Sequence, residues 1–128
     1  MDPKPYFAST SWADLEKINA ALCRAAGHEP GPRAEGYESA RMLWEKTQLQ
    51  PLTFLQAADL CLECHRLAPF QFFNGNVFAN CARVALAPVL DKLDYKKQTF
   101  ARAAMAHYIA GTIDRADFIA IIGPVLGE

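Results

Sequence analysis

Apolar residues recur along this chain every three or four positions, which is the spacing of one face of an α-helix. The first such run, residues 12–26, follows the capping pair Ser11 and Asp14 and ends at Gly27. Its apolar positions are Trp12, Leu15, Ile18 and Leu22. Residues 27–36 are rich in glycine and proline and predict a loop, and residues 37–47 predict a second helix.

The third predicted helix differs from the others because it is apolar around most of its circumference. It opens with the capping box of Thr53 and Gln56, continues to Leu67 and is ended by Pro69. Its apolar positions are Phe54, Leu55, Ala57, Ala58, Leu60, Cys61, Leu62 and Cys64. A helix of this kind belongs in the middle of a bundle.

Three more helices follow the connection at residues 68–76. The fourth helix contains Pro88, which is expected to kink it or end it. The fifth covers residues 97–110, and the sixth begins after Asp114 and is expected to stop at Gly123-Pro124. No segment shows convincing strand alternation. The sequence therefore predicts an all-α bundle of about six helices, with residues 1–10 as an N-terminal arm and 11–128 as one domain.

Composition narrows the class of protein. The chain has 128 residues, 52% of them apolar, which suits one domain with a full core. Its net charge is −1 and its basic residues are dispersed, so we expect no nucleic-acid partner and no membrane partner. The N-terminus lacks a signal-peptide pattern and no apolar run is long enough to span a membrane, which predicts a cytoplasmic protein with reduced cysteines. The four cysteines are Cys23, Cys61, Cys64 and Cys81.

The third predicted helix contains residues that suggest two kinds of metal site, covalently attached haem and zinc. Cys61, Cys64 and His65 match the Cys-x-x-Cys-His pattern of covalent haem attachment, but that attachment takes place outside the cytosol. A zinc site would need further ligands, and the chain has no second Cys-x-x-Cys pair. We expect neither haem nor zinc, and interpret the cysteines as small buried packing residues.

The segment 70–76, Phe-Gln-Phe-Phe-Asn-Gly-Asn, carries the one feature that points to chemistry. Asn74, Gly75 and Asn76 tolerate left-handed backbone, and a turn of this kind before a helix can aim several N–H groups at an anion. The alternative interpretation is an asparagine N-cap after a glycine turn, with the phenylalanines filling the core.

This segment resembles the motif of the Fic/Doc family, especially the Doc-type toxins: His-x-Phe-x-(Asp/Glu)-(Gly/Ala)-Asn-(Gly/Lys)-Arg. Placed without gaps the motif covers residues 70–78, and Phe72, Gly75 and Asn76 match it. The resemblance extends more weakly to residues 15–36 and to the turn at 110–114. It implies a Fic/Doc-like arrangement around a buried central helix.

The departures from that motif concern the charged groups that the family uses. The position of the family's general base is Phe70, or Ala68 if the motif is anchored on residues 68–70 with two extra residues. The acidic magnesium ligand is replaced by Asn74, and the phosphate-binding arginine by Phe78. His65, on the preceding helix, is the one candidate for a substitute base. Phosphoryl transfer depends on positioned charge, so these losses favour a protein that is not an enzyme.

Three functions remain open. The first is a Fic/Doc-like domain with a degenerate motif that binds a protein partner, with weak binding of a nucleotide with Mg²⁺, or another anion, at residues 74–76. The second is an unrelated helical interaction or regulatory protein without a nucleotide site. The third is an active AMP- or phospho-transferase that uses His65. The candidates for a partner-binding surface are Phe70, Phe72, Phe73 and Phe78.

Overall fold

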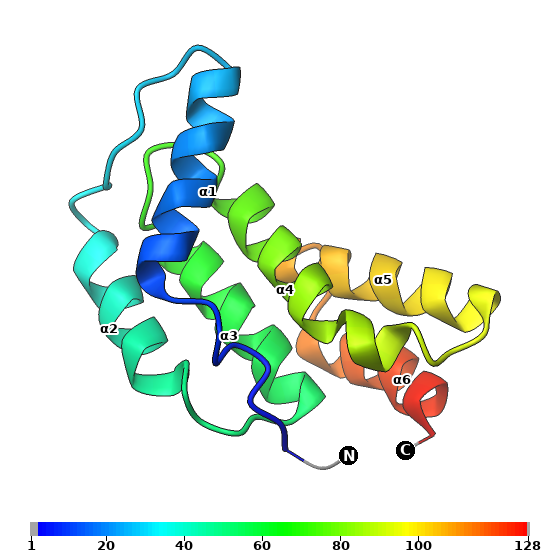
Figure 1. The fold of residues 1–128 in the computed structure, drawn as a ribbon. Helices are drawn as coiled ribbons and strands as arrows, with labels where there is room; N and C mark the ends of the chain where they lie inside the picture. The colour runs from blue at the N-terminus through cyan, green and yellow to red at the C-terminus, as the bar shows by residue number, and fades with distance from the viewer. Residues whose placement is uncertain (1–2, 128) are drawn as a thin grey trace.

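The computed structural model describes residues 3–127, and within them the chain folds into a bundle of six α-helices. Figure 1 shows α3 in the middle of the bundle, with α1 and α2 on one side and α4, α5 and α6 on the other. The helices are α1 (Trp12–Ala25), α2 (Tyr37–Thr47), α3 (Phe54–Leu67), α4 (Asn74–Leu90), α5 (Tyr95–Ala110) and α6 (Arg115–Leu126). The predicted all-α class and number of helices are confirmed.

Helix starts follow the predicted capping chemistry. Ser11 and Asp14 exchange side-chain to backbone hydrogen bonds at the start of α1, and Thr53 and Gln56 do the same at the start of α3. Asp114 caps α6 as expected. Asp94 caps α5, which therefore begins at Tyr95, two residues before the predicted start. These bonds satisfy amide groups that a helix start otherwise leaves without partners.

The central position predicted for the third helix is confirmed. Helix α3 packs against α2, α4 and α5, whereas α1 lies on α4 and α2, and α6 lies on α5. Seven of its residues are buried and cover most of its circumference: Phe54, Ala57, Ala58, Leu60, Cys61, Leu62 and Cys64. Because α3 makes core contacts on several sides, it is the central helix of the bundle.

Two prolines lie inside helices, and both were expected to mark ends or kinks. Helix α4 continues past Pro88 to Leu90, and α6 continues past Pro124. The predicted stop of the last helix at Gly123-Pro124 is therefore wrong. The residues four positions before the prolines, Val84 and Ala120, are exposed, so water can hydrate the carbonyl that loses its helical partner.

The N-terminal segment is part of the domain. Lys4 and Leu52 exchange two backbone hydrogen bonds of 2.8 Å as an isolated antiparallel bridge. The side chain of Phe7 is fully buried, with its ring centroid 4.9 Å from that of Trp44. Within the segment predicted as an N-terminal arm, 1–10, the described residues 3–10 thus pack against the bundle, and residues 1–2 lie outside the described part of the chain. Among the described helices, none combines the length and the apolar character needed to cross a membrane.

Candidate functional site

The connection between α3 and α4 is held in one conformation by Arg33. Its guanidinium donates hydrogen bonds to the carbonyl oxygens of Leu67 (Nη2, 3.0 Å) and Ala68 (Nε, 2.7 Å) at the end of α3. Its backbone N–H donates to the carbonyl of Pro69 at 2.7 Å. A positive charge on the last carbonyls of a helix also interacts favourably with the helix dipole. The loop at 27–36 thus stabilises the connection at 68–76, which contains the predicted functional segment.

Asn74 shapes the turn that precedes α4. Its Oδ1 accepts a hydrogen bond from the Phe70 N–H at 2.9 Å, and its Nδ2 donates to the Phe70 carbonyl at 2.8 Å. The N-cap of α4 is Phe73, in left-handed conformation (φ 65°), and no side chain caps this helix. The interpretation of an asparagine N-cap is therefore wrong, because Asn74, Gly75 and Asn76 all lie within the first turn of α4.

The four phenylalanines proposed as a contact surface divide into two pairs. Phe70 is 3% exposed and Phe78 is fully buried, so the prediction that these two belong to a surface is wrong. Phe70 stacks on Trp12 at 5.6 Å and on Phe78 at 6.4 Å, because these rings fill the space between α1 and α4. Phe72, by contrast, is 40% exposed and Phe73 is half-buried.

Phe72 is exposed and yet firmly held. Its ring is stacked on that of His28, with centroids 4.3 Å apart and planes 15° apart. Its carbonyl accepts a 2.6 Å hydrogen bond from Nδ2 of Asn19, which is the one buried polar residue among residues 3–127. Oδ1 of Asn19 in turn accepts a bond from the Cys23 thiol. A buried amide with both ends satisfied fixes the position of the group that it binds.

The structure brings His65 to the start of α4. Its Nδ1 lies 2.7 Å from the carbonyl oxygen of Ile109, so Nδ1 carries the proton and donates it there. In the neutral ring Nε2 is then an acceptor, and it lies 3.4 Å from the position that a Cβ on Gly75 would occupy. The candidate base and the candidate anion loop are therefore neighbours.

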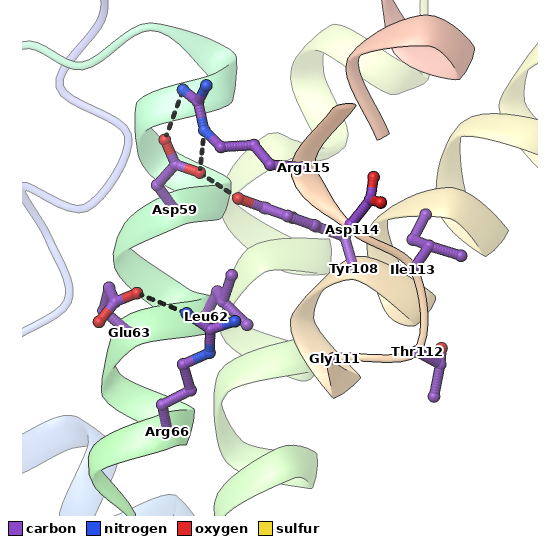
Figure 2. A pocket seen from close by; sticks show the side chains of 10 residues that line it. All are labelled: Asp59, Leu62, Glu63, Arg66, Tyr108, Gly111, Thr112, Ile113, Asp114 and Arg115. Carbon is purple, nitrogen blue, oxygen red and sulfur yellow. Dashed lines mark hydrogen bonds and ion pairs between the residues drawn. The ribbon is translucent and has the colours of Figure 1, made fainter. Parts of the chain in front are cut away.

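A cavity lies elsewhere, where α3 meets the turn between α5 and α6 (Figure 2). It has a volume of about 530 Å³. Arg115 reaches across to Asp59 with an Nη2 to Oδ2 distance of 3.1 Å, and the Tyr108 hydroxyl donates to the same carboxylate. On the next turn of α3, Arg66 pairs with Glu63 at 3.2 Å.

The charges of Asp59, Glu63, Arg66 and Arg115 thus partner one another, while the Asp114 carboxylate caps α6. Burial, followed by the hydrogen bond to Asp59, raises the pKa of Tyr108 to about 12. Each carboxylate on α3 is engaged by an arginine, and Tyr108 is stacked flat on Phe118 at 4.3 Å. This arrangement joins α6 to α3.

All four cysteines are buried and free, as the sequence suggested. Burial, followed by the nearby thiol of Cys81, raises the pKa of Cys64 to about 12, so this group stays a thiol at neutral pH. Among residues 3–127, no three His, Cys, Asp or Glu side chains come together in an arrangement suited to a metal ion.

Three residues of the candidate site were not predicted from the sequence: Asn19, His28 and Arg33. A signal for Asn19 was present, since it lies four positions after Leu15 on the apolar stripe of α1. A polar residue on a buried helix face needs a hydrogen-bonding partner. His28 and Arg33 lie in a loop whose path no periodicity predicts.

The chain was compared with protein-family models, curated proteins and solved structures. No family model matches the chain, and neither a curated protein nor a solved structure is significantly similar to it. Function is therefore inferred from the geometry of the loops and helices themselves.

Proposed function

We propose that this chain is a Fic/Doc-like helical module with a degenerate motif, which binds a protein partner and transfers no chemical group. The observation that carries the proposal is the presentation of Phe72. Its ring is exposed, stacked on His28 and anchored through its carbonyl by the buried Asn19.

A rigid, exposed aromatic ring is well suited to protein recognition. Aromatic side chains supply much of the binding energy at protein interfaces. Binding also costs less when the side chain is already ordered, because less rotamer freedom is lost. Phe73 lies beside Phe72 with ring centroids 6.4 Å apart, which extends the apolar surface. We name the set of Phe72, His28 and the half-buried Phe73 the aromatic edge.

The positions of the transferase motif support the non-catalytic half of the proposal. The place of the general base falls on the buried ring of Phe70 or on Ala68, and neither side chain takes up a proton. The place of the metal-binding acid falls on Asn74, whose amide is bonded at both ends to Phe70. The place of the phosphate-binding arginine falls on the fully buried Phe78. Transfer without these charges would lose most of its transition-state stabilisation.

A weak anion site at α4 is the second candidate, favoured by one observation. The first turn of α4 has no side-chain cap, so the backbone amides of Gly75 and Asn76, together with the exposed side-chain amide of Asn76, are available to an anion such as a nucleotide phosphate. We expect millimolar ATP with Mg²⁺ to raise the unfolding temperature. The shift should diminish in Asn76→Ala.

The protein-binding proposal is tested by comparing captured proteins among three forms of the chain. Wild type, Phe72→Ala and Phe100→Ala are used as baits in the same extract. Phe100 is a matched control because it is also an exposed phenylalanine (59%), but lies on α5. A partner captured by wild type and Phe100→Ala but lost from Phe72→Ala supports the aromatic edge, and calorimetry with the purified partner then gives the affinity.

Two results would contradict the proposal. Equal capture by wild type and Phe72→Ala would remove the aromatic edge as the binding surface. Transfer of labelled AMP from ATP to any protein, abolished in His65→Gln, would establish instead an active transferase that uses His65 as its base.

A further inference from the structure

A narrow groove runs between α4 and α5, which lie side by side in Figure 1. Its volume is about 230 Å³. Two arginines and two asparagines line it above small or apolar side chains, and no carboxylate is among the lining residues. They are Asn76, Ala79, Asn80, Arg83, Arg102, Met105 and Ala106.

The two arginines of this groove differ in their partners: Arg83 lacks a carboxylate within residues 3–127, and Arg102 has one. Nη2 of Arg83 donates to the neutral Oδ1 of Asn80 at 2.7 Å, and Arg83 makes no ion pair within residues 3–127. Arg102 donates through Nη2 to Asp91 at 2.9 Å. Its Nε is buried without a hydrogen-bonding partner. Like Arg102, most other arginines contact a carboxylate, and Arg83 does not: Arg33, Arg41, Arg66 and Arg115.

An unpartnered buried donor is unfavourable, and so are two positive charges that share one groove. Both costs fall when an anion enters. The charge of Arg83, which has no carboxylate partner within residues 3–127, gains an anionic partner, and a shift of the Arg102 side chain would let its Nε donate to the same anion. Asn76 and Asn80 add neutral amide donors on the α4 side.

We propose that this groove binds the phosphate group of a small phosphorylated ligand. Guanidinium groups bind phosphate oxygens through paired charge-assisted hydrogen bonds, and a tetrahedral phosphate can accept from α4 and α5 at once. The volume is smaller than the roughly 300 Å³ at which sites for drug-sized molecules begin. The groove therefore suits a phosphate or pyrophosphate group, with the rest of any larger ligand outside.

The inference rests on the anion-binding part of the proposed function, and it assigns the binding of the anion to a different set of residues. Asn76 is common to both sites, but the charges come from Arg83 and Arg102 rather than from helix amides. The aromatic edge and its protein partner are independent of this groove.

The test is an NMR titration of the whole chain with sodium pyrophosphate at constant ionic strength, following the arginine Nε–H signals. The expected result is a saturable shift of the Arg83 and Arg102 signals. Arg83→Gln and Arg102→Gln should each weaken binding by about tenfold or more, since each removes a charged donor pair. Arg24→Gln, an exposed arginine of α1, is the matched control and should leave the affinity unchanged.

Further variants allow the test to be completed if Arg102→Gln does not fold. Arg102 also pairs with Asp91, so the fold of Arg102→Gln is checked from its backbone amide spectrum. If that variant is unfolded, Arg83→Gln and Asn80→Ala carry the test, because both positions are on α4 and the Arg83 side chain is exposed. ATP should displace pyrophosphate, since both would place phosphate oxygens in the same groove.

Several outcomes would overturn the inference. One is a titration with no saturable shift, and another is equal weakening in Arg24→Gln, which would indicate non-specific attraction. ATP binding that leaves pyrophosphate in place would also count against it. Binding that needs Asn76 but is unchanged in Arg83→Gln and Arg102→Gln would place the anion on the α4 amides. That last result would overturn the groove while leaving the proposed function intact.

Discussion

The amide nitrogen of Asn19 donates a 2.6 Å hydrogen bond to the carbonyl oxygen of Phe72, and this bond joins α1 to a loop 53 residues further along the chain. Asn19 is 2% exposed, so the bond is shielded from water on the α1 side. The same loop carries the exposed ring of Phe72. One buried polar residue therefore determines how a surface aromatic is presented.

Replacing Asn19 with alanine should lower the free energy of unfolding by about 1–3 kcal/mol, because a buried hydrogen bond is lost and a small cavity is left. Chemical denaturation measures this change. Partner capture should weaken in parallel with that of Phe72→Ala, since the loop is released. An Asn19→Ala variant with unchanged stability and unchanged capture would show that the bond has no part in fixing the loop.

Asn74 and Asn76 form a matched pair of positions in the first turn of α4. Asn74→Ala removes two hydrogen bonds to the Phe70 backbone and should destabilise the fold by roughly 1–2 kcal/mol. Asn76 is exposed and caps nothing, so Asn76→Ala should change the unfolding free energy by less than about 0.5 kcal/mol. Thermal unfolding of both variants checks the difference. Equal effects would contradict the assignment of Asn74 as the turn-forming residue.

Gly36 approaches the end of α3 so closely that no side chain fits. A Cβ there would lie 1.6 Å from the carbonyl oxygen of Leu67. Gly36→Ala should cost about 1–3 kcal/mol, since backbone on both sides must shift. Gly31→Ala is the control in the same loop, because a Cβ there meets no atom within 4 Å. Urea denaturation should show a lower midpoint for the first variant alone, and a stable Gly36→Ala protein would disprove this close approach.

The stability of the fold should depend on the protonation of Tyr108 at high pH. Its pKa rises from about 10 in unfolded chains to about 12 in the fold, so its contribution is fully present below pH 10. That contribution is lost as the pH rises from about 10 to 12, by up to about 1.4 kcal/mol per pH unit. Unfolding measured at pH 9, 10 and 11 should therefore show a shallower decline in Tyr108→Phe than in wild type. A parallel decline in the two proteins would contradict the shift.

Local sequence was sufficient for the helices because their signals are local. The 3.6-residue periodicity, the capping pairs at Ser11 and Thr53, and the glycine after Ala110 each act within a few residues of the backbone they control. The central place of α3 followed from its composition, since a helix apolar on most sides must be surrounded. The stop predicted at Gly123-Pro124 was wrong, because whether a helix continues past a proline depends on what packs around it.

The conformation of the segment 70–76 and the exposure of its side chains could not be predicted from the sequence. The segment 70–76 was identified as the functional loop, yet its phenylalanines were divided between core and surface by contacts with Trp12, Trp44 and His28. Those partners lie 34–58 residues away from the phenylalanines that they contact, and a single sequence contains no record of such pairing. The groove with Arg83 and Arg102 likewise exists because α4 and α5 pack together.

The sequence by itself determined the secondary structure and the fold class, because backbone hydrogen bonding and capping depend on near neighbours. Only the tertiary structure decided which side chains are exposed, which charges lack a partner, and which loops support one another. These properties arise when segments distant in sequence meet, as Asn19 meets Phe72 and Arg33 meets Leu67. Burial and charge pairing are then set by the whole fold rather than by any one segment.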